Sequence, residues 1–204
     1  MGGGAVVPYV ALWTEERALP YQLIQRGGLG IGYADETSVD RDQCGVLWSR
    51  MGSRPGQGRP VYRQMHPLRQ RRAMRRLLCQ VCGQPADETE QGHLWLLVDG
   101  RPGGESDWPE GVANPFPPVC IDCGRLSARL CPPLRRAHVA VRAHSAIHGV
   151  SGVQFCSAGG SDLAFAPGDD GEPVAYEDPA ARWTLATQLT RVLLDCTVVD
   201  LDRL

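Results

Sequence analysis

Two Cys-x-x-Cys pairs constrain this chain more than any other feature of its sequence. The first pair is Cys79 and Cys82, the second is Cys120 and Cys123, and the 37 residues between the pairs contain no cysteine. Each short turn lets two sulfurs face one ion, and two such pairs supply the four thiolates of a tetrahedral zinc site with Zn–S distances of about 2.3 Å. The four cysteines therefore predict a structural Zn²⁺ site.

A glycine follows each pair, Gly83 and Gly124. Glycine readily adopts the left-handed turn that aims backbone amides at a thiolate, which supports the zinc interpretation. Two alternatives stay open. The thiols can form two structural disulfides or be unrelated buried groups, and an iron–sulfur cluster also takes four thiolates, although clusters usually draw three ligands from one tight run.

The composition narrows the protein class. With 204 residues, of which 43% are hydrophobic, the chain can bury one sizeable core or two small ones. Its longest apolar stretch, residues 6–13, is too short to span a membrane, and no basic region followed by an apolar segment opens the chain. We therefore expect a cytoplasmic protein with reduced thiols and no membrane partner. All 21 positive side chains are arginine, which excludes a Walker-type phosphate loop and any lysine nucleophile.

Charge is distributed unevenly around a net value of −2. Residues 43–86 contain nine arginines and no acidic residue, and residues 120–148 add five arginines against Asp122. The flanking segments are acidic, with net charges of −3 for 1–42, −6 for 87–119 and −6 for 149–204. This asymmetry favours a polyanionic partner such as nucleic acid.

The basic block contains a predicted amphipathic helix over residues 67–78, with Pro67 suited to its first position. At about 100° per residue, five arginines fall in one arc of about 160°, opposite Ala73 and Met74. Like charges on one face repel one another, so we predict phosphate binding there. The alternative is that the acidic segment 149–204 neutralises these side chains. The candidate nucleic-acid-binding residues are Arg69, Arg71, Arg72, Arg75 and Arg76.

Several further elements follow from local patterns. Residues 1–33 predict two short strands, or a strand and a turn, with a tight turn or bulge near Gly28 to Gly32. Residues 93–99 predict a strand, and residues 125–130 a short helix that ends before Pro132. This order of knuckle, strand, loop and helix is that of a treble clef. Cys131 is expected to be a packed thiol and not a fifth ligand.

Residues 138–148 predict a strand with histidines on one face, at 138, 144 and 148, together with Arg142. That face can bind an anion or carry acid/base chemistry; the alternative is an ordinary solvated strand face. Asp178 and Pro179 predict the start of a helix that runs to about Leu194, with a packing stripe at Trp183, Ala186, Leu189 and Leu193, before an extended segment 197–201.

The zinc region resembles the treble-clef framework of HNH endonucleases over about a quarter of the chain. The resemblance covers the two cysteine pairs, His93 and Asn114, and implies a catalytic role for His93. Gly92 precedes His93 where an acidic residue is expected, and Gly124 stands where a metal-holding histidine is expected. The run from Gly45 to Cys82 is also similar to proteins of actinomycetes and their phages that carry no known activity.

Together these patterns predict an α+β fold in which a treble-clef or ribbon-like zinc site of four cysteines is embedded in a small mixed domain. We expect an N-terminal segment 1–58, the arginine helix with the zinc module over 59–137, and a C-terminal segment 138–204. The predicted function is zinc-stabilised nucleic-acid binding, with DNA favoured over RNA. A regulatory role is one form that this function can take. The alternatives are a degenerate HNH-like metal-dependent nuclease and a zinc-scaffolded module for a protein partner.

Overall fold

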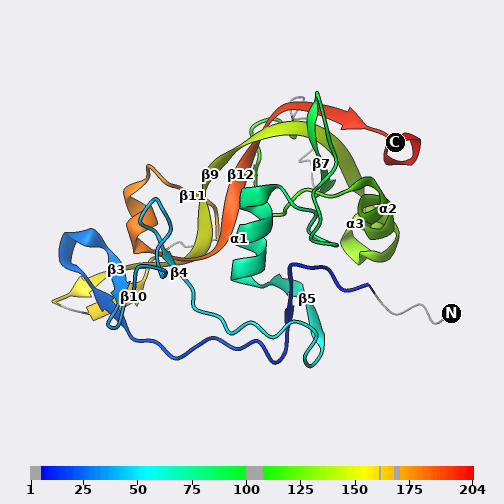
Figure 1. Ribbon diagram of the computed structural model, residues 1–204. Coiled ribbons are helices and arrows are strands. Elements are labelled where there is room, and N and C mark those ends of the chain that lie inside the picture. Colours follow the sequence, from blue (N-terminus) through cyan, green and yellow to red (C-terminus); the bar gives the residue numbers. More distant parts are fainter. Residues whose placement is uncertain (1–5, 100–107, 161, 168–170) are drawn as a thin grey trace. The chain divides into compact units, whose positions relative to one another are not determined.

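The computed structural model describes residues 6–99, 108–160, 162–167 and 171–204 of a mixed α+β chain, mostly sheet with few helices (Figure 1). The chain divides into two compact units. The cysteine unit comprises Met1–Val10, Arg69–Ile147 and Arg191–Leu204. The second unit comprises Ala11–Leu68 and His148–Thr190. The division into segments 1–58, 59–137 and 138–204 stays a prediction.

In the cysteine unit, β7 (Gly92–Val98) pairs antiparallel with the first part of β9 (His138–Gly159), from His93 opposite Ala143 to Val98 opposite His138. The short β6 (Glu88–Thr89) forms a hairpin with β7. The short β8 (Ala113–Asn114) pairs antiparallel with β12 (Thr184–Val199) through Asn114 and Arg191.

Three helices and a terminal 3₁₀ turn complete this unit. They are α1 (Pro67–Arg76), α2 (Ile121–Leu130), α3 (Pro132–Arg136) and η3 (Leu201–Arg203). Figure 1 shows α2, α3 and the C-terminal turn gathered together. Cys131 lies between α2 and α3 and packs against a hydrophobic core. This core includes Val81, which precedes Cys82, and Val119, which precedes Cys120. That core consists of Cys79, Val81, Leu94, Leu96, Val119, Leu134, Ala140 and Leu201.

Three local predictions are confirmed with small changes of boundary. The predicted helix 67–78 is α1, the predicted strand 93–99 is β7, and the helix expected before Pro132 is α2, which begins earlier, at Ile121. Pro132 and Pro133 end α2 but occupy the first turn of α3, because proline lacks only an N–H that a first turn leaves unpaired. Residues 138–148 are extended as predicted, within a longer strand that reaches Gly159.

The predicted helix from Pro179 to about Leu194 is wrong. Asp178 does cap, since its side chain accepts a hydrogen bond from the Ala180 amide at 2.8 Å, but the 3₁₀ turn η2 (Pro179–Trp183) is followed directly by β12. The strand is rich in β-branched residues, which lose rotamer freedom in a helix. Pairing with β4 (Leu47–Trp48) at Leu185 supplies the tertiary contacts that override the helical spacing.

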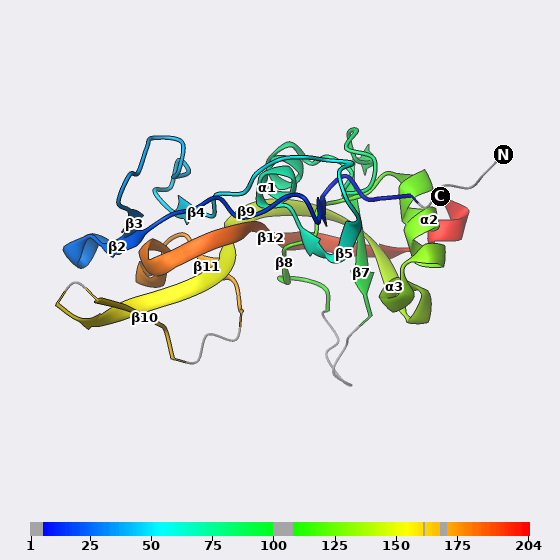
Figure 2. The same cartoon turned by 90° about the horizontal axis from the view of Figure 1, so that it is seen from below.

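The second unit contains several short strands. Strand β1 (Ala11–Trp13) pairs with β5 (Pro60–Met65), and β2 (Leu23–Gln25) pairs with β3 (Ile31–Tyr33) around the 3₁₀ turn η1 (Gly27–Leu29). This turn confirms the tight turn expected in the glycine-rich stretch. Both β10 (Asp162–Phe165) and β11 (Val174–Ala175) pair with β9, and Figure 2 shows β10 alongside β9. None of the described helices is long and apolar enough to span a lipid bilayer.

Candidate metal centre

The four predicted cysteines converge on one point. The sulfur atoms of Cys79, Cys82, Cys120 and Cys123 all lie within 4.8 Å of one another, and the Cys82 and Cys120 sulfurs are 3.9 Å apart. Four thiolates at about 2.3 Å from a tetrahedral zinc ion would lie about 3.8 Å apart, so the spacing fits such an ion. The two pairs form one cluster that can hold a metal ion.

The first pair lies on a tight reverse turn directly after α1. The Gly83 amide donates to the Cys79 carbonyl at 2.9 Å, and the Cys79 amide donates to the Gln84 carbonyl at 2.7 Å. Gly83 has a φ of +73°, which confirms the left-handed turn predicted after this pair. A side chain here would also meet a neighbour, since a Cβ atom on Gly83 would lie 3.0 Å from the Tyr9 ring. The turn therefore requires glycine for two reasons.

The second pair lies at the start of a helix. Cys120 is the N-cap residue of α2, and Cys123 lies in its first turn. The left-handed turn predicted at Gly124 is wrong, because Gly124 is a buried helical residue whose amide donates to the Cys120 carbonyl at 2.8 Å. Its lack of a side chain serves packing, since a Cβ atom there would lie 3.3 Å from the Leu201 side chain. The positive end of the α2 dipole favours thiolate at both cysteines.

Burial opposes ionisation of the clustered thiols. It raises the pKa of Cys79 to about 11, although the backbone amides of Cys82, Cys120 and Val81 donate to this sulfur and act in the opposite direction. Burial also raises the pKa of Cys123, and the neighbouring sulfurs raise it further. At Cys82 burial acts the same way, but the Gln84 amide and the adjacent sulfurs outweigh it and lower the pKa. Because four thiolates so close together repel one another, a bound cation is what allows all of them to ionise.

The five arginines of α1 do not share one environment. Arg69 is buried, with 8% of its surface exposed, and Arg71 is half-buried. Arg72, Arg75 and Arg76 are exposed. Arg69 lies one helical turn before Ala73, which is fully buried, so the packed side of the helix extends over Arg69. The exposed basic face of α1 is therefore made of Arg72, Arg75 and Arg76, which we call the arginine face.

Helix α1 is fixed to the rest of the cysteine unit by polar contacts on its packed side. Gln70 is fully buried and its amide donates to the Pro115 carbonyl at 2.7 Å. The Met74 carbonyl accepts from the Arg191 guanidinium at 3.2 Å. On the arginine face, neither Arg72 nor Arg76 forms a side-chain hydrogen bond or ion pair with any described residue of the cysteine unit. In the part of the acidic segment that belongs to the cysteine unit, Arg191–Leu204, no carboxylate pairs with either side chain.

His93 and Asn114, the residues that the nuclease resemblance selects, lie in different settings. His93 is the second residue of β7, and its Nε2 atom lies 3.8 Å from the Glu88 carboxylate. Burial lowers the pKa of His93, opposed by Glu88 and reinforced by Arg191. Asn114 is buried, and both polar atoms of its side chain form hydrogen bonds with backbone groups. Its Nδ2 donates to the Phe116 carbonyl at 2.9 Å, and its Oδ1 accepts from the Phe116 amide at 3.1 Å.

The histidine face predicted on residues 138–148 is interrupted by a buried ion pair. Arg142 is almost fully buried and pairs with Asp87, which directly follows the first cysteine turn. His144 is exposed, and His138 has its Nδ1 atom 2.9 Å from the Leu134 carbonyl. No local sequence pattern identifies Asp87 as the partner of Arg142. Asp87 is one of several acidic residues in segment 87–119, and nothing in the sequence distinguishes it from the others as the partner of a buried arginine.

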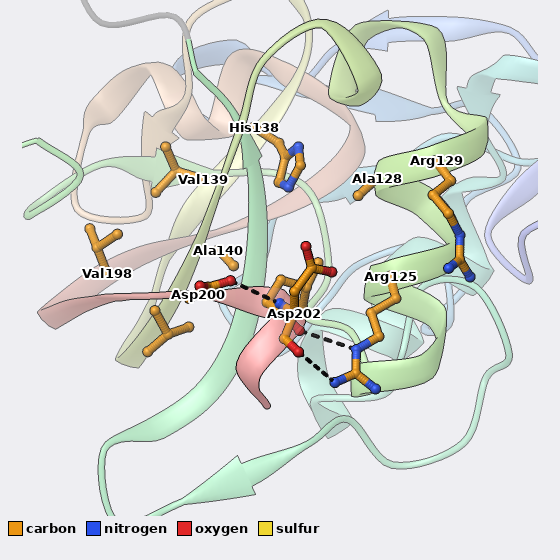
Figure 3. Close-up of a pocket in the computed structure, with 11 residues that line it drawn as sticks. Arg125, Ala128, Arg129, His138, Val139, Ala140, Val198, Asp200 and Asp202 are labelled. Carbon is orange, nitrogen blue, oxygen red and sulfur yellow. Dashed lines mark hydrogen bonds between the residues drawn. The ribbon is translucent and has the colours of Figure 1, made fainter.

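A cavity of about 320 Å³ lies between α2, the start of β9 and the end of the chain (Figure 3). Arg125 donates to the Leu201 carbonyl at 3.1 Å and to the Asp202 carbonyl at 3.4 Å, so this guanidinium is engaged with the backbone. In Figure 3, Asp200 and Asp202 lie below the His138 ring. The cavity presents both charge signs and is lined by none of the cluster cysteines.

Comparisons of this chain with protein-family models, with curated proteins and with solved structures find no match. The cysteine cluster and the side chains around it are therefore the features from which a function can be inferred.

Proposed function

We propose that this chain is a zinc-stabilised nucleic-acid-binding protein of treble-clef type. Four sulfurs in a closed tetrahedral spacing are the donor set of a structural zinc site, because no position is left open for a substrate. The cysteine turn, the hairpin of β6 and β7, and α2 with the second pair at its start follow the order of a treble clef. A cytoplasmic location, where thiols stay reduced, suits such a site.

The observation that carries the nucleic-acid proposal is the arginine face of α1. Its three exposed guanidinium groups, at Arg72, Arg75 and Arg76, occupy one side of a helix whose last residue comes three positions before Cys79. Arginine binds phosphate with a rigid fork of donors and keeps its charge at all physiological pH values. Such a face neutralises a phosphodiester backbone and releases its counterions.

The metal site and the arginine face are coupled through the backbone. The Leu78 amide donates to the Ala73 carbonyl at 2.9 Å, and the Ala86 amide donates to the Leu77 carbonyl at 3.1 Å. The end of α1 is thus hydrogen-bonded to the cysteine turn. In this proposal zinc holds the scaffold and the arginines contact phosphate, an arrangement that gives affinity and orientation without reading sequence.

Fluorescence anisotropy with labelled DNA and RNA, on protein whose zinc content has been measured, tests the proposal. We expect one zinc ion per chain and binding that is lost when Arg72, Arg75 and Arg76 are changed together to glutamine. A matched control removes two exposed arginines elsewhere, Arg17→Gln with Arg203→Gln, and should retain binding. Absence of binding to every nucleic acid at low salt would overturn the proposal.

The same samples distinguish the alternatives. Cleavage of DNA with added Mg²⁺ that is lost in His93→Ala would replace simple binding with the HNH-like nuclease activity. A complex from cell extract that survives nuclease treatment, combined with no affinity for nucleic acid, would replace it with a protein-interaction module.

A further inference from the structure

The cavity of about 320 Å³ beside α2 is built entirely from residues of the cysteine unit. Helix α2 contributes Arg125, Ala128 and Arg129, whose spacing places them on one face of the helix. The start of β9, the end of β12 and η3 supply the rest of the wall. Its volume is at the lower end of the range for small-molecule sites, so the cavity suits a compact ligand.

One wall of this cavity is fixed by Arg125. Its guanidinium donates to the carbonyls of Leu201 and Asp202, at 3.1 and 3.4 Å, and so joins η3 to α2. Leu201 is buried in the core that also contains Cys79. The η3 wall is therefore held by both hydrogen bonds and apolar packing.

Three polar groups on the wall have no partner within the described part of the cysteine unit. They are the Arg129 guanidinium, the Asp202 carboxylate and the Nε2 atom of His138. The His138 Nδ1 atom lies 2.9 Å from the Leu134 carbonyl, which can only accept, so Nδ1 carries the proton of the neutral ring and Nε2 is an acceptor. The wall thus offers a ligand one cation, one anion and one neutral acceptor.

The charges and the apolar residues of the wall restrict the class of ligand. Two arginines and two aspartates balance, so the cavity does not select a polyanion. A metal ion is also disfavoured, because His138, Asp200 and Asp202 are not among the groups of three or more metal-ligating side chains that converge in the described residues. Val198 is 63% exposed at the cavity and gives an apolar ligand group a surface to cover.

The order of these groups across the cavity is visible in Figure 3. In that view Asp202 and His138 lie between the arginines of α2 on one side and Val139 and Val198 on the other. A positive group, a negative group with an acceptor, and an apolar surface thus follow one another. An α-amino acid presents the complementary series of carboxylate, ammonium and aliphatic side chain.

We propose that this cavity binds a small zwitterion with an aliphatic side chain, of the α-amino acid class. Arg129 holds the carboxylate, Asp202 and the Nε2 atom of His138 accept from the ammonium group, and Val139 and Val198 cover the side chain. This site goes beyond the proposed nucleic-acid function and does not depend on it.

Isothermal titration calorimetry of the full, zinc-loaded chain with L-leucine tests the proposal. Isocaproate lacks the ammonium group and isoamylamine lacks the carboxylate, so each should bind at least about tenfold more weakly than leucine. Hydrogen exchange gives a second readout, since leucine should slow amide exchange in residues 198–202.

Two variants determine the orientation of the ligand. Arg129→Gln and Asp202→Asn should each weaken leucine binding by about tenfold or more. Arg129→Gln should also remove the preference for leucine over isoamylamine, and Asp202→Asn the preference over isocaproate. Arg135→Gln is the matched control and should bind leucine as the parent does, because Arg135 is an exposed arginine of α3 that does not line the cavity.

No heat with leucine at millimolar concentration would overturn the proposal, as would isocaproate and isoamylamine binding as tightly as leucine. Unchanged leucine binding in both Arg129→Gln and Asp202→Asn would also overturn it. Each of these results leaves the nucleic-acid proposal standing, since that proposal is measured separately with variants of the arginine face.

Discussion

Asp40 is a buried carboxylate that the second unit keeps ionised. Both of its oxygens accept from the Arg50 guanidinium, at 2.8 and 2.7 Å, and the Thr37 amide and hydroxyl donate to one of them. The Arg50 hydrogen bonds hold the pKa of Asp40 well below its usual range, although burial acts in the opposite direction. The same guanidinium lies 4.2 Å from the centre of the Tyr33 ring, so one arginine joins a carboxylate to the core.

Replacing Asp40 with asparagine should lower the free energy of unfolding of the second unit by about 1.5–3 kcal/mol at pH 7, the range for hydrogen bonds to charged groups. A carboxylate whose pKa is depressed by folding stabilises the protein above its unfolded pKa of about 4, and this contribution is lost as the pH falls towards the folded pKa. The difference in stability between parent and Asp40→Asn should therefore shrink below pH 4. Urea unfolding at pH 7, 5 and 3 measures it, and a difference that grows in acid would contradict the assignment.

Among single residues, the sequence predicted the ligands better than their surroundings. Cysteine spacing reports directly on which sulfurs can share an ion, and the four sulfurs do converge. The roles of the two glycines that follow the cysteine pairs could not be predicted equally well. Gly83 needs a positive φ, but Gly124 is helical and makes room for Leu201, 77 residues further along the chain. A long-range contact of this kind leaves no local pattern.

At the scale of elements, we expect the cysteine turn and the start of α2 to depend on a bound metal ion. The backbone of the turn is hydrogen-bonded to its neighbours, but the four sulfurs come together at a spacing that a metal supports, and burial disfavours the thiolate forms that the metal would stabilise. Removing zinc with a chelator should therefore accelerate amide hydrogen exchange over residues 77–87 and 119–125. Peptides from β3 and β4 in the second unit should exchange at an unchanged rate.

Two serine variants sharpen this prediction. Cys79→Ser should lose bound zinc and reproduce the exchange pattern of the chelated protein, whereas Cys44→Ser should retain zinc, since Cys44 is exposed and lies outside the cluster. Uniform protection after chelation would show that the turn is stable without a metal.

Amphipathic spacing predicted one element correctly and another wrongly. In α1 the apolar positions coincide with good helix-forming residues, and the helix forms where expected. In residues 184–194 the same spacing occurs with Thr187, Thr190 and Val192, and the segment is a strand. Burial there is set by pairing with β4, β8 and β9 and not by one helical face. Such pairing partners lie far away in sequence, so a local pattern cannot reveal them.

At the scale of the whole molecule, net charge argues against attraction to a polyanion. The chain carries a net charge of −2, so binding must depend on the local arginine face and not on the overall field. Short-range contacts of this kind are recognised by their salt dependence, because each neutralised phosphate releases condensed counterions.

Three phosphate contacts, one for each arginine of the face, predict a slope of about −2 for log K against log salt with a single strand. Each single substitution among Arg72, Arg75 and Arg76 should make that slope less negative by about 0.7. Affinity should also be nearly constant between pH 6 and 9, because the chain has no lysine and arginine does not titrate there. For the same reason an arginine-selective dicarbonyl reagent should abolish binding. A slope near zero, or affinity that follows the titration of a histidine, would place the binding surface away from α1.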